Sequence, residues 1–277
     1  MSTKRKVFIH VGLPEGPGDF LEAALDRHQH ALAALGVRNP ASSTDEMFRA
    51  AIEILRDHRA WGYERREVEG AWNGICRRAR KGRDTLVVSQ PLLAAAQTSQ
   101  IELLFDGLAG FERHVVVTAT APDAWTTPGD PAQDLGCVLQ RWAASARRPE
   151  RVHVLVARPD DRAALWTAFG RTVGFGTASL SVADLPTPPT AQPRPAPPER
   201  LTVLRTLAHS WIEQLSTSEY DVRGNVADLL PEASGPDPRD DHQLRETLHE
   251  LERLSRRNQT LERRMAALAK RRRKSVA

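Results

Sequence analysis

The chain has few cysteines and no long run of apolar residues. Its 277 residues include only Cys76 and Cys137, and neither has a second cysteine nearby. This excludes a zinc site of the Cys-x-x-Cys type and a disulfide framework, and His28 and His30 are too poorly spaced on one helix to form a metal pair. The apolar stretch after the basic N-terminus covers only residues 7–9, too short for a signal peptide, and no segment reaches transmembrane length. We therefore expect a cytoplasmic protein without a membrane span or a metal site.

The positive charge of the chain is concentrated near its C-terminus. The formal net charge is +4, but residues 241–277 hold eleven arginines and lysines against five acidic residues. Residues 1–240 therefore carry a small net negative charge. Because the positive net charge comes from residues 241–277, it does not indicate what residues 1–240 bind.

Short β-branched segments predict buried strands at residues 7–11, 86–89, 115–119 and 152–156. They are apolar almost throughout, which is typical of a parallel sheet covered on both faces. Helical spacing of apolar residues separates them, with one stripe over residues 20–35 that ends at Gly36 and others near 47–55, 68–75, 101–108, 135–142 and 164–169. We predict an α/β fold with a mostly parallel sheet flanked by helices. The tryptophans are expected to pack in the core or between subdomains: Trp61, Trp72, Trp125, Trp142, Trp166 and Trp211.

Changes in composition divide the rest of the chain. Residues 186–198 hold seven of the 19 prolines, which predicts a linker or an extended excursion across the surface. A helix is expected over residues 199–215, and residues 232–241 form a second polar break. We predict an α/β domain over residues 1–185, its helical completion over 199–231, an amphipathic helix over 241–270 and a basic tail over 271–277.

A glycine-rich turn follows the first predicted strand. Gly12, Gly16 and Gly18 precede a helix that begins near Phe20. A strand, a glycine-rich turn and a helix together form a common phosphate-binding arrangement, because free N–H groups and the positive end of the helix dipole face the turn. The turn lacks the Gly-Lys-Ser/Thr ending of a Walker A motif. The alternative is a plain strand-to-helix turn whose acidic residues complement the helix dipole.

Several short motifs occur in an order that matches a known family. Residues 10–14 read His-Val-Gly-Leu-Pro and residues 20–21 read Phe-Leu. This resembles the opening His-Val-Gly-Leu-Pro-Lys-Thr-Gly-Thr-Thr-Phe-Leu of bacterial sulfotransferase-family proteins of the P-loop superfold. Similar segments at 35–37, 86–89, 115–119, 139–142, 149–154, 165–166 and 220–231 extend the resemblance over most of residues 6–231. It implies a site for the donor 3′-phosphoadenylyl sulfate at Gly12, Leu13, Pro14, Glu15, Gly16, Gly18, Asp19 and the strand-ending Ser89.

The turn departs from the family pattern at its charged and hydroxyl positions. Glu15 stands where the family has the lysine that neutralises the phosphosulfate, and Gly16 and Gly18 stand where it has hydroxyl residues. Repulsion in place of attraction at ~4 Å, with an effective dielectric of ~20, changes the interaction by ~8 kcal/mol. The family's arginine for the 3′-phosphate is also missing, since this chain has Thr120 there. The donor site therefore reads as degenerate.

These losses favour a sulfotransferase-like pseudoenzyme that needs no cofactor and acts as a scaffold or a partner-binding protein. The alternative is an active sulfotransferase that uses 3′-phosphoadenylyl sulfate, or another nucleotide-binding transferase, built on the turn over residues 12–19. In that alternative His10, at the end of the first strand, is the candidate catalytic base. A structural hydrogen-bonding role for His10, and an ordinary strand-ending role for Ser89, remain the other interpretations.

Residues 244–268 carry a heptad pattern with Asn258 at a central a position, which favours a parallel dimer in register. The pattern predicts either a homodimer or an amphipathic helix that packs on its own domain. The basic run over 270–274 follows the heptads, whereas zipper proteins that read a DNA sequence carry it before them. We expect a solvated tail that makes only weak contacts with anionic partners. The a and d positions are Leu244, Leu251, Asn258 and Met265, and Thr247, Leu254, Leu261 and Leu268.

Overall fold

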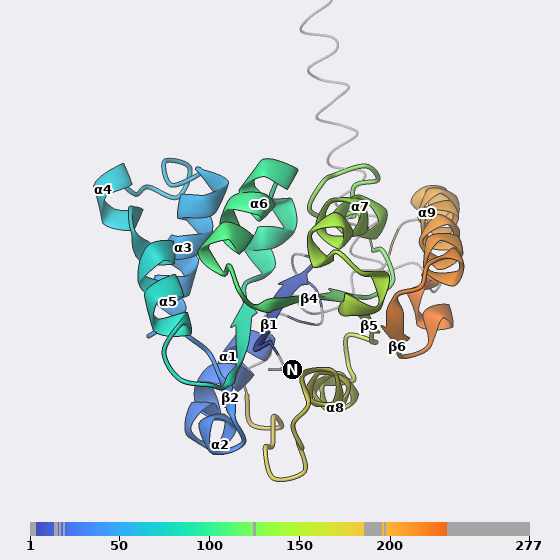
Figure 1. Cartoon of the computed structure of the whole chain (residues 1–277). Coiled ribbons are helices and arrows are strands. Elements are labelled where there is room, and N and C mark those ends of the chain that lie inside the picture. The colour runs from blue at the N-terminus through green and yellow to red at the C-terminus, as the bar shows by residue number, and fades with distance from the viewer. Residues whose placement is uncertain are drawn as a thin grey trace, which may run out of the picture. The chain divides into compact units, whose positions relative to one another are not determined.

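The structure is a computed structural model that describes residues 4–13, 16, 18, 20–123, 126–185, 196 and 198–231. These residues form a six-stranded sheet with helices on both faces (Figure 1). The strands are β1 (Lys6–Gly12), β2 (Val37–Arg38), β3 (Thr85–Ser89), β4 (Glu112–Ala119), β5 (Val152–Val156) and β6 (Asp221–Arg223). The α-helices are α1 (Phe20–Arg27), α2 (Gln29–Ala34), α3 (Thr44–Leu55), α4 (Arg65–Val68), α5 (Ala71–Ala79), α6 (Thr98–Gly107), α7 (Leu135–Ala146), α8 (Arg162–Val173) and α9 (Pro198–Thr217). Short 3-10 helices are η1 (Pro91–Ala95), η2 (Pro149–Arg151) and η4 (Val226–Leu229).

Every strand pairing of the sheet is parallel, in the order β2-β3-β1-β4-β5-β6. The predicted α/β fold with a parallel sheet is therefore confirmed. In the register, His10 lies opposite Ser89 on one side and opposite Val116 on the other, and Gly12 lies opposite Thr118. The carboxyl ends of β1, β3 and β4 thus meet at one edge of the sheet.

Alternate residues of the strands face two separate cores, because successive side chains of a strand point to opposite faces. Ile9, Val88 and Val117 pack with side chains of α3, α5, α6, α7 and α9. Phe8 and Val116 pack with α1, α2, α8 and the segment after α8. Figure 1 shows α3, α5, α6 and α7 on one side of the sheet and α1, α2 and α8 on the other.

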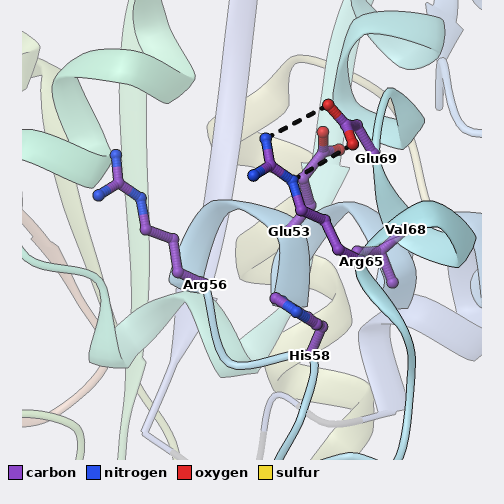
Figure 2. Close-up of a pocket in the computed structure, with 6 residues that line it drawn as sticks. All are labelled: Glu53, Arg56, His58, Arg65, Val68 and Glu69. Carbon is purple, nitrogen blue, oxygen red and sulfur yellow. Dashed lines mark hydrogen bonds and ion pairs between the residues drawn. The ribbon is translucent and has the colours of Figure 1, made fainter.

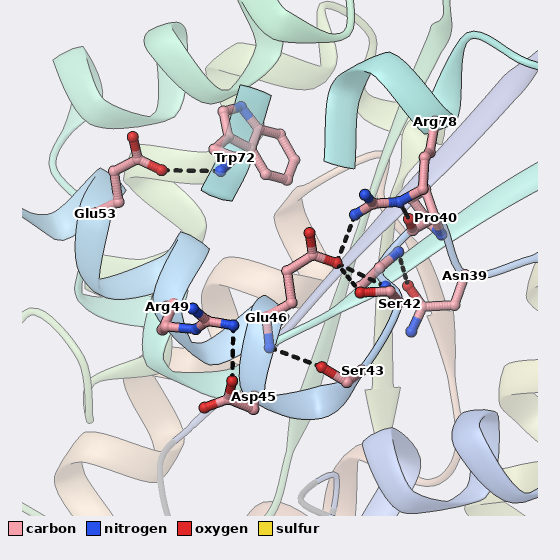
Figure 3. Close-up of polar contacts among 11 residues, drawn as sticks. Asn39, Pro40, Ser42, Ser43, Asp45, Glu46, Arg49, Glu53, Trp72 and Arg78 are labelled. Carbon is pink, nitrogen blue, oxygen red and sulfur yellow. Dashed lines mark hydrogen bonds and ion pairs between the residues drawn. The ribbon is translucent and has the colours of Figure 1, made fainter. Parts of the chain in front are cut away.

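Polar side chains fix the helices over the first face. The Asp134 carboxylate caps α7 and also accepts a hydrogen bond of 2.9 Å from Trp211 Nε1, which joins α9 to α7. Glu46 of α3 accepts hydrogen bonds from Ser42 and Arg78, and Arg78 also donates to the carbonyl of Pro40 (Figure 3). These contacts hold α3 and α5 together.

Several elements differ from the sequence-based expectation. β2 and β6 were not predicted, because they have two and three residues and carry no apolar run. The helix expected over residues 20–35 is broken at His28, whose ring stacks on Trp166 and contacts the carbonyl of Ser181. The helix expected over residues 68–75 is divided at Gly70, which adopts a φ of +88° that favours glycine.

The tryptophan prediction holds for Trp72, Trp142, Trp166 and Trp211, which are buried. It is wrong for Trp61, which is 47% exposed and packs edge-on against Phe48. Trp125 lies outside the described residues, as do most of the predicted proline-rich segment, the helix over 241–270 with its heptads, and the basic tail.

Candidate functional site

The carboxyl ends of β1 and β4 lie at the switch point of the sheet. The connection after β1 leads toward β2 on one side, and the connection after β4 leads to β5 on the other. Ligands of open α/β sheets bind outside the strand ends at such a point. The candidate site is therefore formed by the ends of these two strands and the glycine-rich turn after β1.

His10 is the central side chain at this edge. It is fully buried, and its Nδ1 lies 2.8 Å from Ser89 Oγ while its Nε2 lies 3.1 Å from Thr118 Oγ1. Phe169 of α8 packs edge-on against the imidazole. Burial lowers the pKa of His10 to about 3, so the ring is neutral at physiological pH. The structure thus brings together two of the predicted residues, His10 and Ser89, and adds Thr118; we call these three residues the His10 cluster.

The glycine-rich turn packs directly on the His10 cluster. A Cβ atom on Gly12 would lie 2.9 Å from Thr118 Oγ1, and one on Gly18 would lie 2.2 Å from the same atom and 3.0 Å from His10 Nε2. A Cβ atom on Gly16 would lie 2.5 Å from the carbonyl oxygen of Leu13. These distances require glycine at Gly16 and Gly18 in this conformation. Leu13 is buried, and Pro14, Glu15 and Asp19 lie outside the described residues.

Two arginines near this edge were not singled out from the sequence as site residues. Arg141 of α7 donates hydrogen bonds to the carbonyls of Ala94, Ala95 and Ala96, and so ties α7 to the loop after β3. Arg162 of α8 stacks on the ring of Phe20 at 4.8 Å. No local motif identifies them, because only the folded chain brings α7 and α8 to this edge.

The chemistry of the His10 cluster is that of a closed hydrogen-bonding group. A neutral imidazole donates through one nitrogen and accepts through the other, and the hydroxyls of Ser89 and Thr118 supply the matching acceptor and donor. A general base must reach the proton that it removes. The ring of His10 has no exposed surface and both nitrogens are already occupied. The Thr120 hydroxyl, which directly follows β4, is buried with no hydrogen-bond partner among the described residues and adds no positive charge.

A second histidine-containing group crosses β4, β5 and β6 on the same face of the sheet. Glu112 Oε1 lies 2.9 Å from His114 Nε2, His114 Nδ1 lies 2.9 Å from His153 Nε2, and His153 Nδ1 lies 2.8 Å from Asp221 Oδ2. We call these four residues the histidine–carboxylate array. Both imidazoles are 7% exposed and stack on each other at 5.2 Å. No local motif predicts the array, because its members are up to 109 residues apart along the chain.

The hydrogen bonds of the array require a proton that two neutral histidines do not have. Ionised carboxylates only accept hydrogen bonds, so each of the three contacts needs one N–H. The rings of His114 and His153 must then hold three protons between them and carry one positive charge. Closing all three contacts at once thus takes one proton more than two neutral rings hold; Glu112 and Asp221 favour that added charge, and burial opposes it.

Cations and burial set the pKa values of the array. Burial lowers the pKa of both His114 and His153, against the opposing effect of their carboxylate partners. The hydrogen bond with His114 lowers the pKa of Glu112, which also contacts Arg151 at 3.0 Å. Burial raises the pKa of Asp221, but hydrogen bonds from His153 and Arg223 outweigh it and the net shift is downward. Lys6 adds a further positive field.

A cavity of about 470 Å³ lies between the end of α3 and α4. Its two carboxylates are already engaged, since Glu53 accepts from the backbone N–H groups of Gly70 and Trp72 and Glu69 pairs with Arg65 (Figures 2 and 3). The remaining lining consists of Arg56, His58 and Val68. This cavity offers no pair of free carboxylates for acid–base chemistry.

Among the residues that the structure describes, no cluster of histidine, cysteine, aspartate and glutamate side chains has the arrangement of a metal site. Within the same residues, no helix has the length and apolar character needed to cross a bilayer. Comparisons with protein-family models, with curated proteins and with solved structures found no match to this chain.

Proposed function

We propose that this chain is a sulfotransferase-like pseudoenzyme that acts as a scaffold or a partner-binding protein. The observation that supports this proposal most is the lack of space at two positions of the glycine-rich turn. The family has hydroxyl residues where this chain has Gly16 and Gly18, and here not even a Cβ atom fits at either position. The turn is therefore shaped for packing against Leu13 and Thr118 instead of for presenting hydroxyl groups to a phosphosulfate.

The chemistry around the turn agrees with the loss of donor binding. Glu15 and Thr120 replace the two cations that the resemblance implies. The guanidinium of Arg141 donates its hydrogen bonds to backbone carbonyls, so it does not replace these cations. The neutral and enclosed His10 cannot accept a proton from an acceptor substrate.

Calorimetric titration with adenosine 3′,5′-bisphosphate, the product of the donor, tests this proposal. We expect no saturable binding in the micromolar range by the wild-type chain. Micromolar or tighter binding would contradict a degenerate site and support the active transferase. Glu15→Lys, which restores the missing cation, is the second variant to titrate. Glu213→Lys, which makes the same change of charge on the exposed surface of α9, is its matched control.

The proposed partner includes a second copy of the chain. The heptad pattern over residues 244–268 supports a homodimer, with Asn258 of the two copies paired across the seam. Sedimentation of the full chain at several concentrations tests this, with Leu254→Glu and Leu261→Glu as variants that disrupt the seam. Identical monomers of the wild type and the variants would rule out the homodimer and leave the α/β domain proposal intact.

A further inference from the structure

A second cavity of about 470 Å³ opens between α8 and the end of β6. One wall is formed by Ala163, Ala164, Thr167 and Ala168 of α8. The charged residues of its described lining are two arginines, Arg171 and Arg223, and this lining contains no acidic residue. It differs in this from the cavity beside α4, whose lining has two arginines and two glutamates. A positive cavity with an apolar wall is suited to an organic anion.

Arg223 is held in place by one atom of its guanidinium. Its Nε lies 3.0 Å from Asp221 Oδ2, and the same oxygen lies 2.8 Å from His153 Nδ1. The Nη groups of Arg223 make no hydrogen bond or ion pair with any described residue. The histidine–carboxylate array therefore orients Arg223 and leaves its outer N–H donors unused. A guanidinium that is fixed through Nε loses less conformational entropy when its remaining donors bind a ligand.

Arg171 supplies the second set of donors. It lies in the last turn of α8, where a cation interacts favourably with the helix dipole. That interaction uses none of its N–H groups, and Arg171 has no hydrogen bond or ion pair within the described part of the chain. Planar guanidinium groups pair with the oxygens of carboxylates and phosphates in a two-pronged geometry. Two such groups in one cavity favour an anion with two or more oxygens.

The space in this cavity is preserved by small residues. Gly224 adopts a φ of +100°, and a Cβ atom there would lie only 2.0 Å from the carbonyl oxygen of Val156. The position therefore excludes any larger side chain in this conformation, and the backbone of Gly224 lines the cavity. Alanine methyl groups of α8 provide the apolar surface opposite. The volume lies within the range of small-molecule sites.

We propose that this cavity binds a small organic anion, with carboxylate or phosphoryl oxygens on Arg171 and Arg223 and an apolar body on the alanines of α8. The site contains no residue of the turn after β1, so this proposal holds whether or not that turn binds a nucleotide. The anion adds to the Nη groups of Arg223 without displacing Asp221 from Nε. No covalent step is involved.

Calorimetric titration of the full chain at low salt with phenyl phosphate, benzoate and uncharged phenol tests the proposal. We expect saturable binding of one anion per chain, no saturable binding of phenol, and weakening by added salt. Arg171→Gln and Arg223→Gln should each weaken binding by about tenfold or more, as expected for a lost charge-assisted hydrogen bond. Arg205→Gln on α9 removes the same charge elsewhere on the surface and should leave binding unchanged.

Ala164→Leu adds three carbon atoms to the apolar wall without changing the charge of the lining and should also weaken binding. Because Arg223→Gln also alters the surroundings of Asp221, Arg171→Gln and Ala164→Leu keep the test independent of the histidine–carboxylate array. The proposal is overturned if neither anion binds in the millimolar range. It is equally overturned if the anions bind Arg171→Gln and Ala164→Leu as tightly as they bind the wild type.

Discussion

The two buried histidine groups of this protein lie on the same face of one sheet and have opposite electrostatic designs. His10 contacts two hydroxyl groups, each of which either donates or accepts, so every hydrogen bond is satisfied by a neutral ring. His114 and His153 contact each other and two carboxylates. Ionised carboxylates only accept hydrogen bonds, so the two rings need one additional proton to make all three contacts. The chemistry of the partners sets how many protons each group needs, while burial lowers the pKa of all three rings.

The comparison also separates two roles in the fold. The His10 cluster joins the carboxyl ends of β1, β3 and β4 beneath the glycine-rich turn. The histidine–carboxylate array joins β4 and β5 to β6, an edge strand with no buried residue of its own. Hydroxyl partners surround the histidine at the switch point, and carboxylate partners flank the two histidines that join the edge strand to the sheet.

The largest effect should come from filling the space above the His10 cluster. In Gly18→Ala the new Cβ would lie 2.2 Å from Thr118 Oγ1, so the turn or the cluster must move. We expect the free energy of unfolding to fall by about 3 kcal/mol, at the upper end for overpacking. Urea unfolding measures it. Gly176→Ala is the control, since nothing lies within 4 Å of a Cβ at Gly176; equal stability of the two variants would mean that the turn does not pack on the cluster.

The second effect is a loss of stability in acid that arises from the buried imidazole of His10. The folded-state pKa of His10 is lowered from 6.5 to about 3, so below pH 6.5 the unfolded chain binds a proton that the folded chain excludes. Stability contributed by the neutral ring is therefore lost as the pH falls, by up to about 1.4 kcal/mol per pH unit. Between pH 6.5 and pH 5 this amounts to about 1.6 kcal/mol, because the slope reaches its full value only below pH 6. Urea unfolding over this pH range measures it.

His10→Gln should remove this part of the pH dependence, whatever its effect on stability at neutral pH. His209→Gln, a change at an exposed histidine of α9, should leave the slope as in the wild type. If both variants retain the wild-type slope, His10 is protonated in the folded protein and the closed description of the cluster is wrong.

A smaller loss of stability is expected when a carboxylate of the histidine–carboxylate array is neutralised. Asp221→Asn keeps an oxygen that can accept from His153 but removes the charge that balances the shared proton. We expect a loss of about 1.5 kcal/mol at pH 6, the lower end for a charge-assisted hydrogen bond, because the Asp221 side chain is 32% exposed. Nitrogen-15 chemical shifts of the imidazoles should show the pair of His114 and His153 losing its third proton at a lower pH than in the wild type. Unchanged shifts would mean that the rings hold no shared proton.

Much of the fold followed from the apolar pattern of the strands. The β-branched runs around Ile9, Val88, Val117 and Val154 are buried on both faces, and such runs predict a parallel sheet. β6 was not predicted, because Asp221 and Arg223 make it polar. These residues form a strand because they pair with β5, and the local sequence does not indicate that pairing.

The candidate site was predictable only in part. His10, Ser89 and the glycines could be singled out because they lie at a strand end or in a turn with a known physical role. Thr118 and the array could not be linked to them or to each other, since the contacts depend on the order of the strands in the sheet. His114 and Asp221, for example, become members of one group only because β5 lies between β4 and β6.

The smallest expected effect marks the solvent-exposed end of the array. Arg151 contacts Glu112 at 3.0 Å, and both side chains are more than one-fifth exposed. Water screens such a pair, so Arg151→Gln should lower the free energy of unfolding by only about 0.5 kcal/mol. It should also raise the pKa of Glu112, because the nearby cation favours the carboxylate form. Urea unfolding and carbon-13 titration of the Glu112 carboxyl measure the two effects. A loss as large as that in Asp221→Asn would mean that the array is stabilised by its outer ion pair and not by the proton between its histidines.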